Sequence, residues 1–365
     1  MSMNSIYKGE VLNLEIYGES HSPTIGVYIK GLPEGVTPDE DYTRALMARR
    51  APGQNAWSTP RKEKDAVIFE KSDDETLHGY IVNTNTKPKD YASIMNTPRP
   101  SHADFTARIK YGEEASKSGG GIFSGRMTAP LCIAGSIALN ELNKRGINIY
   151  SHVKSIAGVE DDVYANHATL DSDFEAKLSE VKTKEFPVVD DSKGELMKAK
   201  IEEARMDLDS VGGIIETVVY GMPEGIGGPI FGGIEAKVAT LLYAIPAVKG
   251  VEFGNGYDVA NLRGSENNDS FVMDGDNVTM RTNHSGGILG GISVGGTVAP
   301  IVVNCAIKPT PSISKEQDTV DISKKENAKI TIAGRHDPCI VPRAVPVTEA
   351  AVALALYDMI LAKEA

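Results

Sequence analysis

The chain has 365 residues, of which 41% are hydrophobic and 24% are charged, and its net charge at pH 7 is −12. This length and composition fit a globular protein of one large or two ordinary domains, and the negative charge argues against a nucleic-acid partner. Since no run of eighteen apolar residues occurs and residues 1–10 lack the features of a secretory signal, we expect a cytoplasmic protein that spans no membrane.

Turn and capping residues divide the first 145 residues into strands and helices. A strand is predicted over residues 25–30, and Thr37-Pro-Asp-Glu40 predicts a capped helix start, with proline at the first helical position. Two further strands, near 65–70 and 79–84, are expected in a polar, hairpin-like segment. Residues 126–145 predict an amphipathic helix, because a cation followed by glycine ends the pattern.

The segment from about 160 to 208 is charged and predicted to be helical. Ser172-Asp-Phe-Glu175 predicts a second capping box, and residues 193–207 predict a helix with a solvated face. We expect this segment to be scaffold, because it carries no catalytic pattern.

The segment from Gly334 to Glu349 is rich in proline and places Arg335, His336 and Asp337 side by side. A residue before proline is disfavoured in a helix, so Asp337 is expected on extended or turn backbone. A nearly all-apolar helix over 347–362, opened by Pro346, is expected to be buried.

Two pairs of segments repeat in the same order along the chain. Residues 218–226 resemble residues 28–36, and residues 285–292 resemble residues 118–125. The repeats predict a single domain of two pseudo-symmetric halves, about 1–160 and 210–365, although chance similarity of short glycine-rich segments stays an alternative. Because strands and helices do not alternate regularly, the predicted fold class is α+β.

Histidines in glycine- or proline-flanked turns are candidates for proton transfer, and they are His21, His102, His284 and His336. No spacing suits a metal, and the three cysteines, Cys132, Cys305 and Cys339, form no paired motif, so we predict free thiols and no metal site. General acid–base catalysis suits these histidines better than metal binding does. The remaining histidines lie in polar stretches and are predicted at the surface: His78, His152 and His167.

Two glycine-rich loops, 119–125 and 286–291, lack the P-loop and dinucleotide-binding patterns, so tight backbone packing and phosphate contact are equal alternatives for each. Arginines flank these and similar loops: Arg49, Arg50, Arg99, Arg126, Arg335 and Arg343. Guanidinium groups suit carboxylates and phosphates, and Lys308-Pro-Thr-Pro-Ser312 adds a cation and hydroxyls. The residues alone therefore predict an enzyme that acts on a small, multiply anionic substrate.

The motifs, taken in order, resemble those of the chorismate synthase family across most of the chain. They are Gly18-Glu-Ser-His21, Arg49-Arg50-Ala-Pro-Gly53, Arg99-Pro-Ser-His-Ala-Asp104, Lys110-Tyr-Gly112, Val248-Lys-Gly-Val-Glu-Phe-Gly254, Asn283-His-Ser-Gly-Gly-Ile-Leu-Gly-Gly-Ile-Ser293, Lys308-Pro-Thr310 and Gly334-Arg-His-Asp-Pro-Cys339. The resemblance implies a β-α-β sandwich, a homotetramer, and conversion of 5-enolpyruvylshikimate 3-phosphate to chorismate and phosphate. It also implies reduced FMN as cofactor, in a reaction that completes the shared route to the aromatic amino acids.

The resemblance further implies roles for individual residues. His21 would protonate the departing phosphate, His102 would supply a proton to the reduced flavin, and Asp337 would act with flavin N5 to remove the C6 proton. The substrate contacts would be Arg49, Arg50, Arg126 and Arg335, with Arg50 also the family's contact for a pyridine nucleotide. The FMN contacts would be Arg50, Ile122, Phe123, Ser124, Pro246, Ala247, Gly290, Lys308, Pro309, Thr310, Pro311, Ser312 and Arg335.

The chain departs from the family pattern at several positions. Residues 122–126 lack one arginine and one hydroxyl that many members carry, and Ser22 and Ser101 stand where glycine is usual. Ala56 replaces the second arginine of the nucleotide site, which leaves open whether NADPH or a separate reductase reduces the flavin. These departures keep two alternatives: a flavin-binding or flavin-reductase relative that has lost the elimination, and a phosphate-binding module without flavin.

Overall fold

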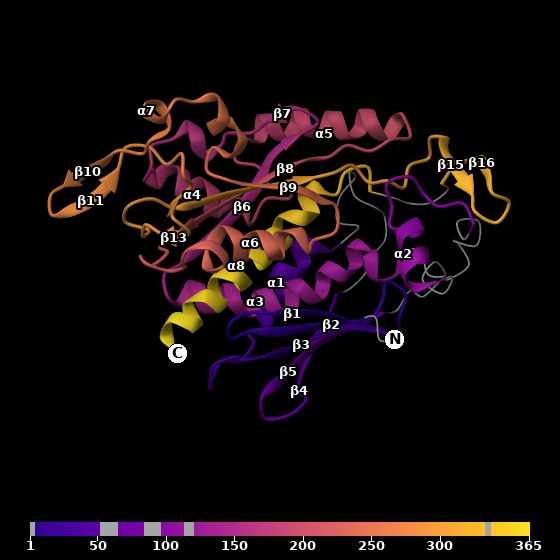
Figure 1. Ribbon diagram of the computed structural model, residues 1–365, viewed down its shortest axis with the longest axis horizontal. Coiled ribbons are helices and arrows are strands. Elements are labelled where there is room, and N and C mark those ends of the chain that lie inside the picture. The colour runs from indigo at the N-terminus through magenta and orange to yellow at the C-terminus, as the bar shows by residue number, and fades with distance from the viewer. Residues whose placement is uncertain (1–3, 52–64, 84–95, 113–119, 333–336) are drawn as a thin grey trace.

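The computed structural model describes residues 4–51, 65–83, 96–112, 120–332 and 337–365. Two five-stranded sheets enclose a layer of helices (Figure 1). The α+β class and the β-α-β sandwich expected from the resemblance are therefore confirmed.

The first sheet is entirely antiparallel and is built from the N-terminal part of the chain. Its order is β1-β2-β3-β5-β4. The strands are β1 (Ser5–Lys8), β2 (Asn13–Tyr17), β3 (Thr24–Lys30), β4 (Val67–Lys71) and β5 (Thr76–Val82). The strand predicted at 25–30 and the hairpin of β4 with β5 both occur in this sheet.

The second sheet is also antiparallel and has the order β7-β6-β8-β14-β9. Its strands are β6 (Asn148–Ile156), β7 (Val159–Glu160), β8 (Gly213–Tyr220), β9 (Val248–Phe253) and β14 (Ile301–Ile307). Three small hairpins lie outside the two sheets: β10 (Phe271–Asp274) with β11 (Asn277–Met280), β12 (Ile288–Leu289) with β13 (Ile292–Ser293), and β15 (Gln317–Asp321) with β16 (Glu326–Ile330).

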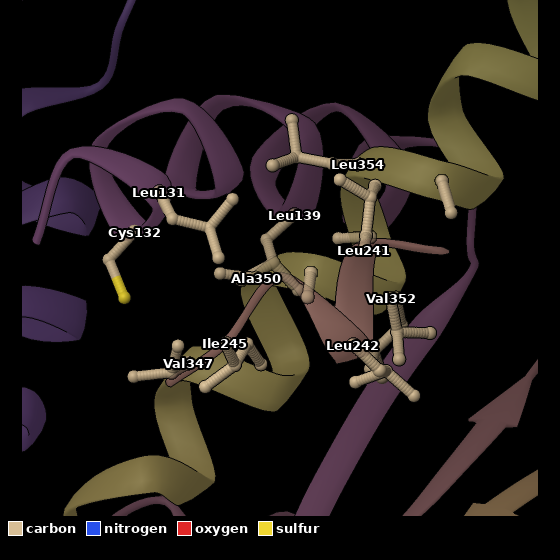
Figure 2. Close-up of a cluster of buried hydrophobic side chains, with 14 of the residues drawn as sticks. Leu131, Cys132, Leu139, Leu241, Leu242, Ile245, Val347, Ala350, Val352 and Leu354 are labelled. Carbon is tan, nitrogen blue, oxygen red and sulfur yellow. The ribbon is translucent and has the colours of Figure 1, made fainter. Parts of the chain in front are cut away.

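Four helices form the layer between the sheets: α1 (Glu40–Arg50), α3 (Thr128–Lys144), α6 (Ile234–Tyr243) and α8 (Val341–Glu364). Apolar side chains of α3, α6 and α8 meet in the core, as Figure 2 shows. A side chain at Gly135 of α3 would collide with Ala350 of α8, so the two helix backbones can approach closely only because position 135 is glycine. By length and composition α8 could cross a membrane, but 94% of its apolar window is buried within the protein.

When the edge strands β1 and β7 and all elements outside the two sheets and the helix layer are left out, the order strand, strand, helix, strand, strand, helix occurs twice along the chain. It is β2-β3-α1-β4-β5-α3 in the first part and β6-β8-α6-β9-β14-α8 in the second. Gly31 after β3 and Gly221 after β8 both have positive φ, and a side chain at either would collide with a carbonyl before the neighbouring strand, that of Val11 or Gly146. In one of the two repeated pairs, residues 28–36 and 218–226, both segments thus contain a similar turn, because each turn needs a left-handed residue pressed against backbone.

The outer face of the second sheet is covered by α4 (Ser172–Val181) and α5 (Asp191–Met206), which form the charged middle segment (Figure 1). Phe174 and Leu178 of α4 pack on Val218 and Tyr220 of β8. The remaining helices are short: α2 (Asp104–Tyr111), α7 (Gly264–Asn267) and the 3₁₀ turns η3 (Gly121–Phe123), η4 (Gly125–Met127), η5 (Tyr164–Asn166), η6 (Ile230–Gly232) and η7 (Gly256–Asn261).

Two predicted helix starts are wrong for the same reason. The helix α1 is capped by Asp39, which accepts a hydrogen bond from the Tyr42 N–H at 2.9 Å, and not by Thr37. Asp171 rather than Ser172 caps α4. In both segments two capping residue types lie close together, and aspartate was the one used as the cap.

The predictions for the two most apolar helices also need correction. Residues of α3 are buried on nearly every side, so the helix is not amphipathic: it is covered by a sheet, by α1 and by α8. The helix α8 begins at Val341 and continues through Pro346. Pro342 lies in the first helical turn, where its missing N–H would have no partner within the helix.

The three histidines predicted at the surface lie instead against side-chain partners. His152 is fully buried between Asp161, at 2.8 Å, and Glu216, at 3.1 Å. His78 is nearly buried and stacks between Tyr28 and Tyr80. His167 is bonded to Asp162 and Asp171. Polar neighbours in the sequence therefore did not mark solvent exposure, because carboxylates from other positions pair with these three histidines in the fold.

Candidate active site

A cavity of about 710 Å³ lies at one end of the helix layer and is lined from both halves of the chain. The C-terminal residues of α1 and α6, Arg50 and Tyr243, contribute to its wall, as do the N-terminal residues of α3 and α8, including Thr128 and Arg343. Helix N-termini carry partial positive charge and unpaired N–H groups. The N-termini of α3 and α8 therefore favour an anionic group beside them, whereas the C-termini of α1 and α6 do not, so the charge preference of the site depends on its side chains.

The side chains that line the cavity are strongly cationic. Six lysines and arginines lie on its wall: Arg50, Arg99, Arg126, Lys249, Lys308 and Arg343. Among the described lining residues Asp337 is the one carboxylate. In a chain with net charge −12 this local reversal of sign indicates a site for an anion with several charges.

Arg50 and Arg126 share one buried carboxylate, Asp65. Asp65 Oδ2 accepts a hydrogen bond from Arg50 Nη2 at 2.5 Å, and Oδ1 accepts one from Arg126 Nη1. Burial raises the pKa of the Asp65 carboxyl, but the charges of the two arginines outweigh burial and lower it. Asp65 therefore stays ionised and holds both guanidinium groups in place.

Arg99, His102 and Asp104 form a second cluster at the wall. Arg99 donates to both oxygens of Asp104 at 2.7 Å and to Ser312 Oγ at 3.1 Å. His102 Nδ1 lies 2.6 Å from Asp104 Oδ1 and 3.0 Å from Arg99 Nη2. Because the carboxylate contact is shorter and an ionised carboxylate can only accept, we assign the Nδ1 proton to the bond with Asp104, which leaves Nε2 for a ligand.

Burial would raise the pKa of Asp104, yet its hydrogen bonds from Arg99 and His102 hold that pKa well below its usual range. The carboxylate is thus ionised wherever the fold is intact. It fixes the orientation of the His102 ring.

Lys308 ties together two strained backbone positions. Its Nζ donates to the carbonyl of Ser101 at 2.5 Å, and its backbone N–H donates to the carbonyl of Ala247 at 3.0 Å. Ser101 and Ala247 both have positive φ, which is unfavourable for residues with a side chain. Burial, and then the charge of Lys249, lower the pKa of Lys308. Two lysines thus face the same part of the cavity.

Asp337 lies on irregular backbone before Pro338, as predicted, and its side chain is almost buried. Arg343 Nη1 donates to Asp337 Oδ2 at 2.6 Å, and Arg343 Nε donates to the carbonyl of Arg50 at 3.2 Å. Arg343 therefore connects the carboxylate of the second half to the end of α1 in the first.

Most of the site residues predicted from the sequence lie on this one cavity. They are Arg50, His102, Ile122, Phe123, Ser124, Arg126, Pro246, Ala247, Lys308, Thr310, Pro311, Ser312 and Asp337. Arg335 and His336 lie outside the described residues, as does Ala56. Four predicted residues do not line the cavity: His21, Arg49, Gly290 and Pro309.

Arg49 is placed away from the cavity, against Glu349 of α8. Its two terminal nitrogens donate to the Glu349 carboxylate at 2.6 and 3.0 Å. Glu349 is buried and also accepts the backbone N–H of Ser151 at 3.1 Å. Arg49 therefore links α1 to α8, and both of its terminal nitrogens point to Glu349 and not to the cavity.

The loop of His21 lies beside the cavity wall. Ser20 lines the cavity, and its N–H donates to the carbonyl of Gly121 at 3.3 Å. Ser22, which stands where the family has glycine, donates to the carbonyl of Thr24 at 2.6 Å and accepts the N–H of Glu19 at 2.8 Å. This substitution therefore stiffens the turn that carries His21.

The two glycine-rich loops serve different purposes. Residues 120–126 line the cavity from Gly120 to Arg126, apart from Gly121. In the other loop Gly286, Gly287 and Gly291 have positive φ and press against backbone of other segments, so side chains there would collide. None of residues 283–293, including His284, lines the cavity, and tight packing explains this second loop.

Several residues of the site were missed or left without a role. Arg99 and Arg343 lie near glycine- or proline-rich loops, and Lys249 stands inside a family motif, so the sequence carries a signal for all three. Asp104 likewise stands inside a family motif with its partners Arg99 and His102, whereas Asp65 carries no local signal of its function. The partners of Asp65 became visible only in the fold.

Comparison with known proteins gives one family throughout. A family model described as chorismate synthase matches residues 12–361. Chorismate synthase of Lancefieldella parvula is 42% identical over 96% of this chain and 94% of its own length, and that of Methanosarcina mazei is 42% identical over 97% and 95%. A solved structure titled "Crystal Structure of Chorismate Synthase" superposes with a TM-score of 0.75 over 98% of this chain and 93% of that chain, at 23% identity, which supports the fold.

Proposed function

The chain belongs to the chorismate synthase family, and from this membership we propose that the cavity is where the reaction takes place, with reduced FMN as the cofactor. The chain is a carbon–oxygen lyase that converts 5-enolpyruvylshikimate 3-phosphate to chorismate and phosphate. The observation that carries the proposed site is the meeting of six cationic side chains with His102 and Asp337 on one wall.

The donor set fits a substrate and a cofactor that together carry two carboxylates and two phosphates. Arg50 Nε and Thr310 Oγ1 are buried and have no hydrogen-bond partner in the described part of the chain. A buried polar group without a partner is costly, so both atoms suit contact with ligand oxygens. We assign the FMN phosphate to Lys308, Thr310 and Ser312, and the anionic groups of the substrate to Arg50 and Arg126.

When bound, reduced FMN supplies transient electron density to the elimination. The chain supplies positioning and proton transfer. We assign removal of the C6 proton of the substrate to the carboxylate of Asp337, whose Oδ2 accepts a hydrogen bond from Arg343. His102 presents Nε2, the ring nitrogen on the side away from Asp104, to the ligand, and we assign proton transfer to this atom. The arginines stabilise negative charge on the departing phosphate.

We assign protonation of the departing phosphate to His21. Its loop is fixed against residues 120–124 by Ser20 and is braced by Ser22. Since His21 does not line the cavity as it stands, this role requires the His21 ring to reach the phosphate once the substrate is bound.

The test is phosphate release from 5-enolpyruvylshikimate 3-phosphate by purified protein under anaerobic conditions with chemically reduced FMN. Steady release that depends on reduced FMN is expected. Oxidised FMN serves as the control. If the protein binds reduced FMN but releases no phosphate, the proposal is contradicted, and a flavin-binding relative that has lost the elimination is favoured.

The reductant is tested separately, by an aerobic assay with NADPH and FMN but no dithionite. Arg50 is buried, lines the cavity and is bonded to Asp65 and Thr128, so it presents no guanidinium group to a pyridine nucleotide at the surface. We therefore propose that a separate reductase supplies reduced FMN. Turnover with NADPH and FMN, in the absence of dithionite and of a separate reductase, would contradict this proposal.

We propose further that the chain is a single domain that forms a homotetramer in the cytoplasm. Large apolar side chains are exposed on the η6 turn and on the β10–β11 hairpin, among them Ile230 at 80%, Phe231 at 87% and Met273 at 66%. Such exposure is typical of surfaces that a second copy covers. Light scattering on the purified protein should give four times the 39.0 kDa mass of the chain.

A further inference from the structure

We propose that Asp65 is a positioning residue of the reaction: its single carboxylate holds Arg50 and Arg126 side by side as one two-armed grip for an anionic oxygen group of the substrate. The inference rests on the proposed site. It adds a residue that does not itself line the cavity and that belongs to none of the motifs discussed above.

The geometry is that of a bridge. The Asp65 side chain is only 2% exposed, and each of its oxygens accepts from a different arginine. Arg50 ends α1, Arg126 precedes α3, and Asp65 precedes β4, so three separate segments meet at one carboxylate. Because the two oxygens of a carboxylate are fixed relative to each other, the two guanidinium groups are held at a fixed separation.

Further contacts set the orientation of each arginine. Arg50 Nη1 donates to Thr128 Oγ1 at 3.2 Å, and Arg126 Nη2 donates to Asn83 Oδ1 at 3.0 Å. Arg50 Nε remains buried and without a partner in the described residues, on a side chain that lines the cavity. The terminal nitrogens of the two arginines are therefore held by protein groups, and Arg50 Nε remains as a donor for a ligand.

Charge gives Asp65 a second effect. Two neighbouring guanidinium groups would repel each other and would attract small anions of any shape. One shared carboxylate leaves the pair with a net charge of one, so affinity for a free anion falls while the geometry is kept. Asp65 thereby lowers the affinity of the two arginines for small anions in general and keeps the geometry that aligns the substrate.

The experiment compares three variants with the wild type: Asp65→Asn, Asp65→Glu and the control Asp41→Asn. Asp41 is an exposed partner of Arg44 at 2.6 Å and is not among the residues that line the cavity. Two quantities are measured: the dissociation constant of inorganic phosphate by calorimetry, and kcat and KM for phosphate release with reduced FMN.

For Asp65→Asn we expect tighter phosphate binding, by about tenfold, because one compensating charge is gone. Its kcat should fall by about 10²-fold, because the arginines lose their common anchor. Asp65→Glu keeps the charge, so its phosphate affinity should stay within about twofold of the wild type while kcat falls by at least about tenfold. Asp41→Asn should match the wild type in both quantities.

A purely structural role for Asp65 predicts a lower active fraction with unchanged phosphate affinity per folded site, and that result in Asp65→Asn overturns the proposal. If Asp65→Asn does not fold, the kcat of Asp65→Glu is the deciding measurement, and a kcat equal to that of the wild type overturns the proposal. If the wild type itself shows no turnover, the proposed site chemistry fails. The difference in phosphate dissociation constant between the wild type and Asp65→Asn then still tests whether Asp65 offsets the charge of Arg50 and Arg126.

Discussion

Raising the pH from 7 to 9 should destabilise this protein through one buried histidine, His152. Burial alone would lower the pKa of His152, but hydrogen bonds with Asp161 and Glu216 outweigh burial and raise it to about 9. The ordinary value is 6.5. A raised pKa in the folded state stabilises the fold below the unfolded value, and this contribution is lost as the pH rises through the folded value.

The size of the effect follows from the two pKa values. Each pH unit between them is worth about 1.4 kcal/mol, so the proton on His152 contributes about 3 kcal/mol at pH 6 and below. The contribution should decline between about pH 6.5 and 9. The buried thiols of Cys132, Cys305 and Cys339, whose pKa burial raises to about 12, add a loss of stability only above the ordinary thiol value of 9.0.

The assay is urea unfolding followed by circular dichroism at pH 7.0, 8.0 and 9.0 for the wild type, His152→Gln and His167→Gln. His152→Gln should be about 3 kcal/mol less stable at pH 7, because two buried carboxylates lose their cation, and should lack the decline over this range. His167→Gln, a less buried histidine between two aspartates, should keep the decline. Equal slopes in wild type and His152→Gln would refute the reasoning.

Three further predictions concern the cavity and its supports. Asp337→Asn and His102→Ala should each lower anaerobic phosphate release by about 10²–10⁴-fold, and wild-type rates in both would remove their proton-transfer roles. Ser101→Gly should raise the free energy of unfolding by up to about 1 kcal/mol, because Ser101 has a φ of 57° that glycine adopts without strain; a lower melting temperature would contradict this. Glu349→Gln should cost about 3 kcal/mol in urea unfolding by leaving Arg49 without its charge partner, and an unchanged midpoint would show that the pair is dispensable.

The elements of this fold were largely readable from the sequence, while their ends were not. The helices at 128–144 and 191–206 and the strand at 24–30 all correspond to predicted elements. Boundaries failed where two capping residue types were close, as at Thr37 and Asp39, because local sequence does not decide which of them the chain uses.

The cationic part of the site was also predictable, because arginines next to glycine- or proline-rich turns stand out in the sequence. Among the acidic residues Asp337 was also predicted, but Asp65 and Glu349 were not. Asp65 meets Arg50 over 15 residues and Arg126 over 61, and Glu349 meets Arg49 over 300. Pairing across such separations depends on the packing of α1, α3 and α8, for which no local pattern exists. The same limit explains why His152 was misassigned: its partner Glu216 is 64 residues away.

Helix ends from both parts of the chain place the site. Helices α3 and α8 bring their N-terminal residues to the cavity, and α1 and α6 bring their C-terminal residues. The first half then supplies the Asp65 grip and His102, whereas the second supplies Lys308, Asp337 and Arg343. Since Arg343 reaches from α8 to the carbonyl that ends α1, each half orients the other's chemistry. Neither half alone would hold an anion and a base in register, so the function depends on the packing of the helix layer as much as on the residues that line it.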